Sequence, residues 1–417
     1  MKNSVIVNYK SIINRHIDLR PARQVFGNDY YIDAYGCIIN FTNDNFEADL
    51  FHLNKYPNRY GGVVKFGEEL ALVPINYDKF RFYNPNTKAV REIEIPDMDF
   101  IKEDEAGGCF ISAARYDEKI VYCPFMYHKV AIYNTKADEI EYHALPDSYA
   151  KIISRNIERN MSRMCPSFHC YNGKAWFLFR EPCSILELSL ETGEFKVFDV
   201  SKHGKFLNIF GNEKDLWLTP WRDCNKVVSL NIDSLDKTTY KFDIAGFYGN
   251  DKNLNGIGFH NDFVYLMPSA NDCFIKINKK TKDVVKFNIN GYEPDTKINE
   301  TLERGERFLP CYVFLGQLGH YWRIFSYEDF STIVFDLETE EVTSKIATVY
   351  DINIFNTIAK EKLEDHYIKA KKYGTVFREG ESVFNVYIPE ANTSDLSGDN
   401  STFGKKIYEY VKRKVGV

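Results

Sequence analysis

The sequence predicts an all-β fold made of repeated, four-stranded antiparallel sheets. The first observation is the composition, because 15% of the 417 residues are aromatic, with 28 Tyr and 32 Phe, and aromatic residues favour strands. The second is a succession of short apolar segments separated by turn-forming residues. The third is that this succession recurs along most of the chain, which indicates one structural unit copied several times.

The unit is clearest in residues 60–95. Apolar strands are predicted there at Gly62–Phe66, Leu70–Val73, Phe80–Tyr83 and Val90–Ile95. The turn-forming segments between them are Gly67–Glu68, Pro74–Asp78 and Asn84–Thr87. Four short strands joined by tight turns make one antiparallel meander. Such a sheet cannot bury its faces alone, so it requires copies of itself on either side.

The copies keep the same landmarks in the same order. The second strand ends on proline in four of them, at Pro74, Pro124, Pro220 and Pro268. The third strand stops at Asn or Asp before a Thr-containing turn, as in Asn84–Thr87, Asn278–Thr281 and Asp336–Thr339. The complete units cover residues 60–97, 108–147, 166–200, 204–244, 256–290 and 311–348. Their spacing of roughly 50 residues is typical of the blades of a β-propeller.

Over about residues 60–348 this pattern resembles the kelch- and YncE-like branch of the β-propeller superfamily, of bacterial type. The double-Gly kelch signature and the Trp-Asp dipeptide of other propellers are missing from the units. The resemblance therefore implies a fold, a β-propeller of four-stranded antiparallel blades, and no particular activity.

An incomplete unit in residues 29–54 precedes the first complete one and lacks a fourth strand. Because an unpaired blade edge promotes aggregation, we expect a terminal strand, either Val5–Tyr9 or Ser382–Ile388, to complete it. This interpretation predicts seven blades within residues 1–390. Six blades with a β-rich N-terminal appendage is the alternative. Residues 351–417 are expected to supply a closing strand and two short helices, at Phe355–Lys372 and Ser401–Lys414, packed on the propeller.

Charge and composition narrow the possible partners. The formal net charge is −6, which argues against a phosphate-binding surface and so against nucleic acid as the main partner. The N-terminal residues have no secretory signal pattern, and no run of 18 apolar residues predicts a membrane span. The nine cysteines contain no CxxC pair, so a cytoplasmic location is expected. The nine histidines do not converge in the sequence, and neither a metal site nor a cofactor is expected.

One face of the predicted propeller should carry the binding site. The loops between the second and third strands of each blade emerge on the same face as the segments that join one blade to the next. The longest insertions fall on this face, at residues 96–107, 146–166, 245–256 and 290–310. Long loops on a rigid scaffold are where binding residues usually lie.

The loops after the second strands are rich in aromatic, cationic, amide and carboxylate side chains. The candidate ligand-binding residues are Tyr77, Asp78, Tyr127, His128, Arg180, Glu181, Trp221, Arg222, Asp223, Asn271, Asp272, Tyr327 and Glu328. Rings can stack on the C–H face of a sugar while Arg, Asn and Asp hold hydroxyls or amides, so this set suits a saccharide or a polar peptide. The alternative is that these residues form good hairpin loops and that Trp221 packs between blades.

A helix is predicted between two blades at Ser148–Met164. Ile153, Ile157, Met161 and Met164 form its apolar stripe, and Arg155, Arg159 and Arg163 recur every four residues beside it. Three guanidinium groups on one face could receive a carboxylate or a phosphate. The alternative is a surface helix that docks by its apolar stripe and leaves its arginines in water.

Two functions from different classes are consistent with these patterns. The first is a non-catalytic binding or scaffold propeller that recognises a saccharide, a peptide or a partner protein on the face with the long loops. The second is a lyase or hydrolase with an acid/base or metal-assisted site at the mouth of the central channel. We favour the first, because no P-loop, Rossmann glycine pattern, HExxH, GxSxG or CxxC motif occurs. Carboxylates and a histidine at the mouth could serve the second, namely Asp78, His128, Glu181, Asp223, Asp272 and Glu328.

Overall fold

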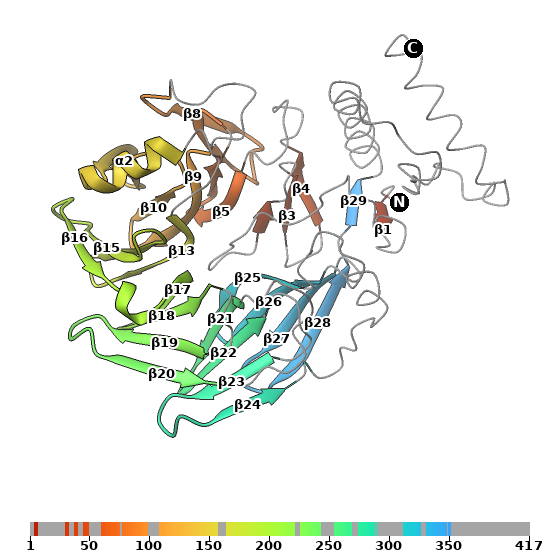
Figure 1. Ribbon diagram of the computed structural model, residues 1–417. Helices are drawn as coiled ribbons and strands as arrows, with labels where there is room; N and C mark the ends of the chain where they lie inside the picture. Colours follow the sequence, from red (N-terminus) through yellow and green to blue (C-terminus); the bar gives the residue numbers. More distant parts are fainter. Residues whose placement is uncertain are drawn as a thin grey trace, which may run out of the picture.

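Six four-stranded antiparallel sheets lie around a common centre, with their first strands toward the middle (Figure 1). The computed structural model describes residues 4–6, 30–32, 37–40, 45–49, 60–75, 77–98, 108–156, 164–221, 226–242, 254–268, 274–287, 289, 312–326, 331–347 and 349–351. The fold is a β-propeller, as the repeats predict, and it has six blades.

Each blade is a meander whose strands pair in sequence order. Blade one holds β5 (Tyr60–Phe66), β6 (Glu69–Pro74), β7 (Lys79–Tyr83) and β8 (Val90–Glu94). Blade two holds β9 (Phe110–Tyr116), β10 (Lys119–Pro124), β11 (Lys129–Asn134) and β12 (Glu139–Ala144). Blade three holds β13 (Met164–Tyr171), β14 (Lys174–Phe179), β15 (Ser184–Ser189) and β16 (Phe195–Asp199).

The other three blades follow the same plan. Blade four holds β17 (Phe206–Asn212), β18 (Asp215–Pro220), β19 (Lys226–Asn231) and β20 (Lys237–Lys241). Blade five holds β21 (Leu254–His260), β22 (Phe263–Pro268), β23 (Phe274–Asn278) and β24 (Val284–Phe287). Blade six holds β25 (Tyr312–Leu318), β26 (Tyr321–Ser326), β27 (Ser331–Asp336) and β28 (Glu341–Ala347).

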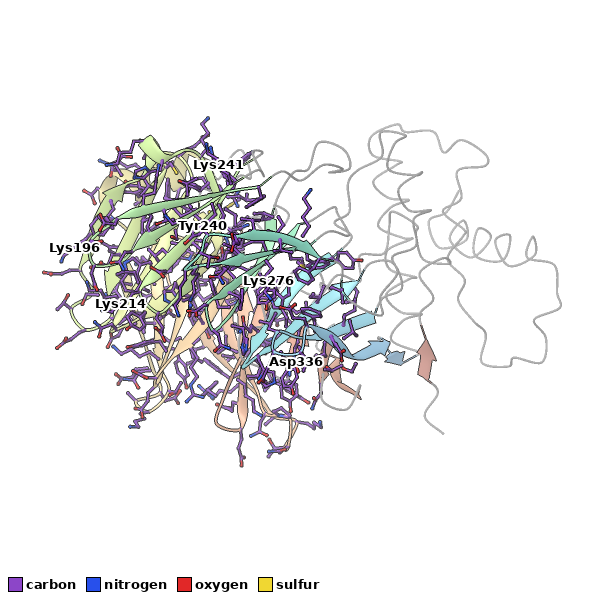
Figure 2. All side chains as sticks on the ribbon, turned by 90° about the horizontal axis from the view of Figure 1, so that it is seen from below. Lys196, Lys214, Tyr240, Lys241, Lys276 and Asp336 are labelled. Carbon is purple, nitrogen blue, oxygen red and sulfur yellow. The ribbon has the colours of Figure 1, made fainter. Side chains whose placement is uncertain are left out.

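The core lies between the blades, where side chains fill the space from sheet to sheet (Figure 2). A second strand such as β10 is buried along almost its whole length, whereas the outermost strand β8 alternates between exposed and half-buried residues. Between blades one and two, Phe80 and Tyr122 meet edge to face with ring centroids 4.8 Å apart. A strand covered on both faces needs a continuous apolar run, and an outer strand needs alternation.

The polar residue at the end of each third strand, Asn or Asp in five blades and Ser189 in blade three, shapes the following turn. In blade one the Asn84 Oδ1 atom accepts the N–H groups of Asn86 at 2.9 Å and Thr87 at 3.0 Å. The N–H of Lys88 then donates to the Asn84 carbonyl at 2.8 Å. The last turn residue has positive φ in every blade, at Lys88, Asp138, Gly193, Leu235, Lys282 and Glu340. Short polar side chains that bind the next N–H groups favour such turns.

In the part of the chain that the structure describes, the expected seventh blade does not form, so the count of seven was wrong and the alternative of six was right. β2 (Tyr30–Ile32), β3 (Cys37–Asn40) and β4 (Asn45–Asp49) make a sheet that has three strands in the described part of the chain. β2 lies against β5, the first strand of blade one.

The N-terminal strand that was expected to complete this sheet pairs elsewhere. β1 (Ser4–Ile6) forms a two-stranded sheet with β29 (Val349–Asp351), which lies beside β4 (Figure 1). The segment after blade six therefore takes the hydrogen bonds of the N-terminal strand. The other candidate, Ser382–Ile388, and the helices expected at Phe355–Lys372 and Ser401–Lys414 lie outside the described residues.

In blades one to four, the loop after the second strand and the segment between blades share one face, as predicted. Four hydrogen bonds join a loop after a second strand to a segment between blades: Ile95 N–H to the Asp78 carbonyl, Leu145 to His128, Val200 to Cys183, and Trp221 to Lys205, each at 2.9–3.1 Å. We call this the loop face. Among the described residues, no helix is long and apolar enough to cross a membrane.

The helix predicted between blades two and three is also present on this face. α2 (Asp147–Asn156) packs the Tyr149 ring edge to face on Phe179, with centroids 4.8 Å apart. Ile153, a member of the predicted stripe, is buried. Met164 was assigned to the helix wrongly, since it begins β13 and is buried there. Residues 157–163 lie outside the described part.

Candidate functional site

A β-bulge interrupts the first strand of every blade, and in five blades it lies close to the loop face. The extra residues of β5, β9, β13, β17 and β21 fall opposite the last residues of the second strand. In β25 the bulge lies between Phe314 and Gly316, opposite the middle of β26. Bulges bend a strand and redirect its side chains, and they are common at rims and beside functional sites. The rim of the loop face is therefore where a site is best sought.

Two predicted site residues from neighbouring blades meet at this rim. Arg180 follows β14 in blade three, and Trp221 follows β18 in blade four. The guanidinium carbon of Arg180 lies 5.3 Å from the centre of the Trp221 ring, which is within the range of a cation–π contact. The Trp221 N–H donates to the Lys205 carbonyl at 2.9 Å and holds the backbone of this loop in place.

The Arg180 guanidinium has no counter-ion in the described part of the chain. Its Nε atom is buried and makes no hydrogen bond there, although the side chain as a whole is partly exposed. No carboxylate of the described residues forms an ion pair with it. A buried donor without a partner costs about 1–3 kcal/mol, so this guanidinium is available for an additional acceptor.

Two buried thiols lie next to Arg180. The Cys165 Sγ atom donates to the Leu207 carbonyl at 2.6 Å. Burial raises the pKa of Cys165 to about 11, and the Arg180 guanidinium opposes that rise through its charge and through a hydrogen bond with the thiol. Burial likewise raises the pKa of Cys183, in the same loop as Arg180. Both thiols are therefore protonated near neutral pH, which makes them packing groups and poor nucleophiles.

The chain segment next to the contact between Arg180 and Trp221 is the shortest of those that join consecutive blades. Residues 200–205 connect blades three and four and form a single 3₁₀ turn at Ser201–His203. The other connections span residues 95–109, 145–163, 242–253 and 288–311. The junction of Arg180 and Trp221 thus carries less inserted chain than any other between consecutive blades.

The predicted residues of blade one take part in a closed network. The Tyr77 hydroxyl donates to Glu92 Oε1 at 3.0 Å and accepts a hydrogen bond from Arg81. Burial, with Glu92 nearby, raises the pKa of Tyr77 to about 12, although Arg81 opposes it. Asp78 is exposed. Tyr77 is therefore a structural donor in this conformation.

Arg81 itself was missed by sequence reasoning, since it stands in the middle of β7 among apolar residues. It is 4% exposed. Its Nη1 atom donates to the Tyr60 hydroxyl at 2.7 Å, and its Nε atom donates to Glu92. Burial opposes ionisation of Glu92, but hydrogen bonds from Arg81 and Tyr77 outweigh it and lower the pKa of that carboxyl. The one available signal was that Arg81 follows the predicted site residue Tyr77 by four residues, so that a loop residue and a strand residue can come into contact.

The predicted residues of blade two are mostly packed. Tyr127 is fully buried, and its hydroxyl donates to the Pro96 carbonyl at 3.0 Å. The His128 ring lies 5.1 Å from the Tyr127 ring, and burial, reinforced by Lys129, lowers its pKa. Lys129 is paired with Asp97 at 2.7 Å. This loop offers a neutral imidazole and no uncompensated charge.

The other predicted site residues stay predictions. Glu181 is exposed beside Arg180. Arg155 lies in α2, with its side chain outside the described residues. Also outside are Arg159, Arg163, Arg222, Asp223, Asn271, Asp272, Tyr327 and Glu328. In the described part, no cluster of three or more His, Cys, Asp or Glu side chains could hold a metal ion.

Comparison with known proteins supports the fold and goes no further. No family model matches the chain. No curated protein matches it either. Among solved structures, Hsv2 from Kluyveromyces lactis with a replaced loop has a TM-score of 0.50 at 7% identity, covering 79% of this chain and 99% of that one.

Two further solved structures are similar to this chain. The computationally designed Ika8 protein has a TM-score of 0.50 at 7% identity and covers 79% of this chain and 88% of its own. Virginiamycin B lyase from Staphylococcus aureus, at 12% identity, covers 68% of this chain and 82% of its own with a TM-score of 0.47. Identities this low define a class, the β-propellers, and assign no activity. The kelch-like character stays a resemblance of sequence.

Proposed function

We propose that this chain is a non-catalytic binding or scaffold propeller that recognises a polar ligand, either a saccharide or a peptide, or a partner protein on its loop face. The observation that carries the proposal is the Arg180–Trp221 pair, in which an uncompensated guanidinium and a partly exposed indole ring meet at the rim. A cytoplasmic location remains a prediction.

The pair supplies the two components that polar recognition requires. The indole ring offers an apolar face on which C–H groups can stack, and the guanidinium offers several N–H donors in a planar fork. Both stand on loops anchored by strands on either side, and the Trp221 backbone is hydrogen-bonded to Lys205. A rigid support of this kind lowers the entropy lost on binding.

Binding is supported better than hydrolysis or elimination. The thiols beside Arg180 have raised pKa values and stay protonated. Histidine–carboxylate contacts in the described residues, His143–Glu141 at 3.6 Å and His320–Asp336 at 3.9 Å, involve strands and turns away from the Arg180 loop. General acid–base chemistry needs such a pair within reach of the reacting group.

The test uses calorimetry to measure the affinity of neutral and acidic oligosaccharides and short peptides. The intact chain is compared with Trp221→Ala. We expect Trp221→Ala to weaken binding at least tenfold, which corresponds to ~1.4 kcal/mol, while circular dichroism remains unchanged. Tyr321→Ala is the matched control, because Tyr321 is an exposed ring, 38% accessible, at the β25–β26 turn on the opposite face. Equal affinity in Trp221→Ala and the unmodified chain would overturn the proposal.

A further inference from the structure

We propose that the ligand of the loop face carries a carboxylate, and that this carboxylate draws the Arg180 guanidinium away from the Trp221 ring and opens the ring for stacking. This inference rests on the proposed function, because it names the chemical group that the same site recognises and the movement that accompanies recognition.

The charge of Arg180 is the first argument. Arg81 is paired with Glu92, and Arg91 is paired with Glu69 at 3.0 Å and Asp138 at 2.9 Å. Arg180 has no such partner in the described part of the chain, although its Nε atom is buried. Arg81 and Arg91 are thus neutralised by carboxylates, whereas the described residues leave the charge of Arg180 to pair with an added anion.

The present position of Arg180 is the second argument. A cation–π contact at a partly exposed site stabilises by about 0.5–1 kcal/mol. The unpartnered Nε atom costs about as much or more. The guanidinium therefore loses little when it leaves the ring, and it gains charge-assisted hydrogen bonds if an anion lies within reach.

The chemical class of the anion follows from the planar shape of the Arg180 guanidinium and from the charge of the neighbouring residue. A guanidinium matches a planar carboxylate with two parallel N–H···O bonds. Glu181, the next residue, is exposed and carries a negative charge in the same loop. A phosphate group carries about −1.5 to −2 charges near neutral pH and would be repelled more strongly there than a carboxylate with one. The site therefore favours a carboxylate, as found in a uronic acid or at a peptide C-terminus.

The position of Trp221 makes the movement measurable. The chain has four tryptophans. Trp176, Trp217 and Trp322 are at most 2% exposed, whereas Trp221 is partly exposed. A neutral quencher such as acrylamide will therefore report mainly on Trp221, and it becomes more effective when the guanidinium leaves the ring.

The experiment titrates the intact chain with sodium acetate at constant ionic strength, with sodium chloride as the reference salt. We expect acetate to increase acrylamide quenching, chloride to leave it unchanged, and Arg180→Met to abolish the acetate response. Arg180→Lys keeps the charge without the fork and should retain a weaker response. Trp221→Phe confirms that the signal comes from Trp221. An unmodified chain with no acetate response, or with equal acetate and chloride responses, would overturn the inference.

A second set of probes separates the two sources of carboxylate and the two proposals. D-Galacturonic acid is compared with D-galactose, and an acetylated peptide acid is compared with its amide. The favoured source is the acid that binds at least tenfold more tightly than its neutral partner, with the difference lost in Arg180→Met. If neutral and acidic probes bind equally but Trp221→Ala abolishes binding, the carboxylate inference fails and the proposed function stands. If Trp221→Ala and Arg180→Met both bind like the unmodified chain, both fail.

Discussion

Two arginines of this propeller lie against aromatic rings in opposite circumstances. Arg81 in blade one lies 4.2 Å from the centre of the Tyr77 ring and also makes hydrogen bonds to Tyr60, Tyr77 and Glu92. Arg180 in blade three lies 5.3 Å from the Trp221 ring and has a buried Nε atom without a partner in the described residues.

The difference is between an arginine whose charge is neutralised inside the protein and one whose charge is not neutralised by the described residues. Around Arg81 the donors and acceptors satisfy one another, so an incoming ligand would have to displace existing bonds. Around Arg180 no described carboxylate neutralises the charge, so an incoming anion displaces no ion pair and replaces only the weaker contact with the Trp221 ring. Residue type alone cannot distinguish the two, because both combine an arginine with an aromatic ring.

The largest expected effect is on stability and comes from blade one. Arg81→Met keeps the unbranched stem of the side chain but leaves the buried Tyr60 hydroxyl without this donor. We expect the free energy of unfolding to fall by about 2 kcal/mol, less than the roughly 3–5 kcal/mol of a fully buried pair because water reaches Glu92. Urea denaturation followed by circular dichroism measures it.

Arg115→Met is the control, since Arg115 is exposed and donates to the Asp117 carbonyl. Equal losses in the two variants would contradict a special role for the Arg81 network.

Tyr77→Phe should have a smaller effect of the same sign. It removes the hydroxyl that bridges Arg81 and Glu92 but keeps the ring, and we expect a loss of about 1 kcal/mol. Tyr321→Phe, which removes an exposed hydroxyl at the β25–β26 turn, should stay within about 0.5 kcal/mol of the unmodified chain. The same urea titration measures both. Should Tyr77→Phe be neutral while ligand affinity falls, Tyr77 would belong with Trp221 as a binding residue.

The third expectation concerns how the stability loss in Arg81→Met depends on pH. The pKa of Glu92 is lowered in the folded chain, so its contribution is present above the usual glutamate value of 4.5 and is lost as the pH falls through the lowered value. The stability difference between the unmodified chain and Arg81→Met should therefore shrink between pH 5 and acid. Urea midpoints at several pH values measure it. A difference that stays constant over this range would mean that Glu92 is not the partner that matters.

The smallest expected stability effect belongs to the other arginine. Arg180→Met removes an uncompensated charge and keeps the packing of the side-chain stem, so the free energy of unfolding should change by less than about 0.5 kcal/mol or rise slightly. Thermal and urea unfolding without added anions measure it. A loss as large as that of Arg81→Met would show that Arg180 holds the fold and would remove the contrast between the two sites.

Much of the fold could be predicted because its determinants are local. The turn after each third strand depends on a side chain that binds the next few N–H groups, as Asn84 does, and the ends of second strands such as Pro74 are marked by proline. The count of blades was missed because it depends on which distant strand pairs with which. β1 carries no mark in the sequence that sends it to β29 and not to the sheet of β2–β4.

The site was predictable only as a set of loops. Repeat alignment places Arg180 and Trp221 at equivalent positions of adjacent blades, which is why both were named and why they meet. Whether a given charge is neutralised depends on side chains that approach from other strands. The partner of Arg81 is Glu92, eleven residues away on β8, and periodicity does not specify that pairing. Sequence reasoning therefore placed the candidate residues on one face. It could not tell that Tyr77 is hydrogen-bonded within the protein while Trp221 contacts an arginine without a carboxylate partner among the described residues.

The pairing of β1 with β29 has a consequence for how the protein is made. Residues Ser4–Ile6 and Val349–Asp351 are joined in register although the six blades lie between them in the chain. While the polypeptide emerges from the ribosome, each blade can assemble from neighbouring segments as it appears. The first strand, however, has to wait until translation has passed Asp351, so this pairing is among the last to form. Nascent chains halted before that point would carry complete blades and an N-terminal strand still without its mate.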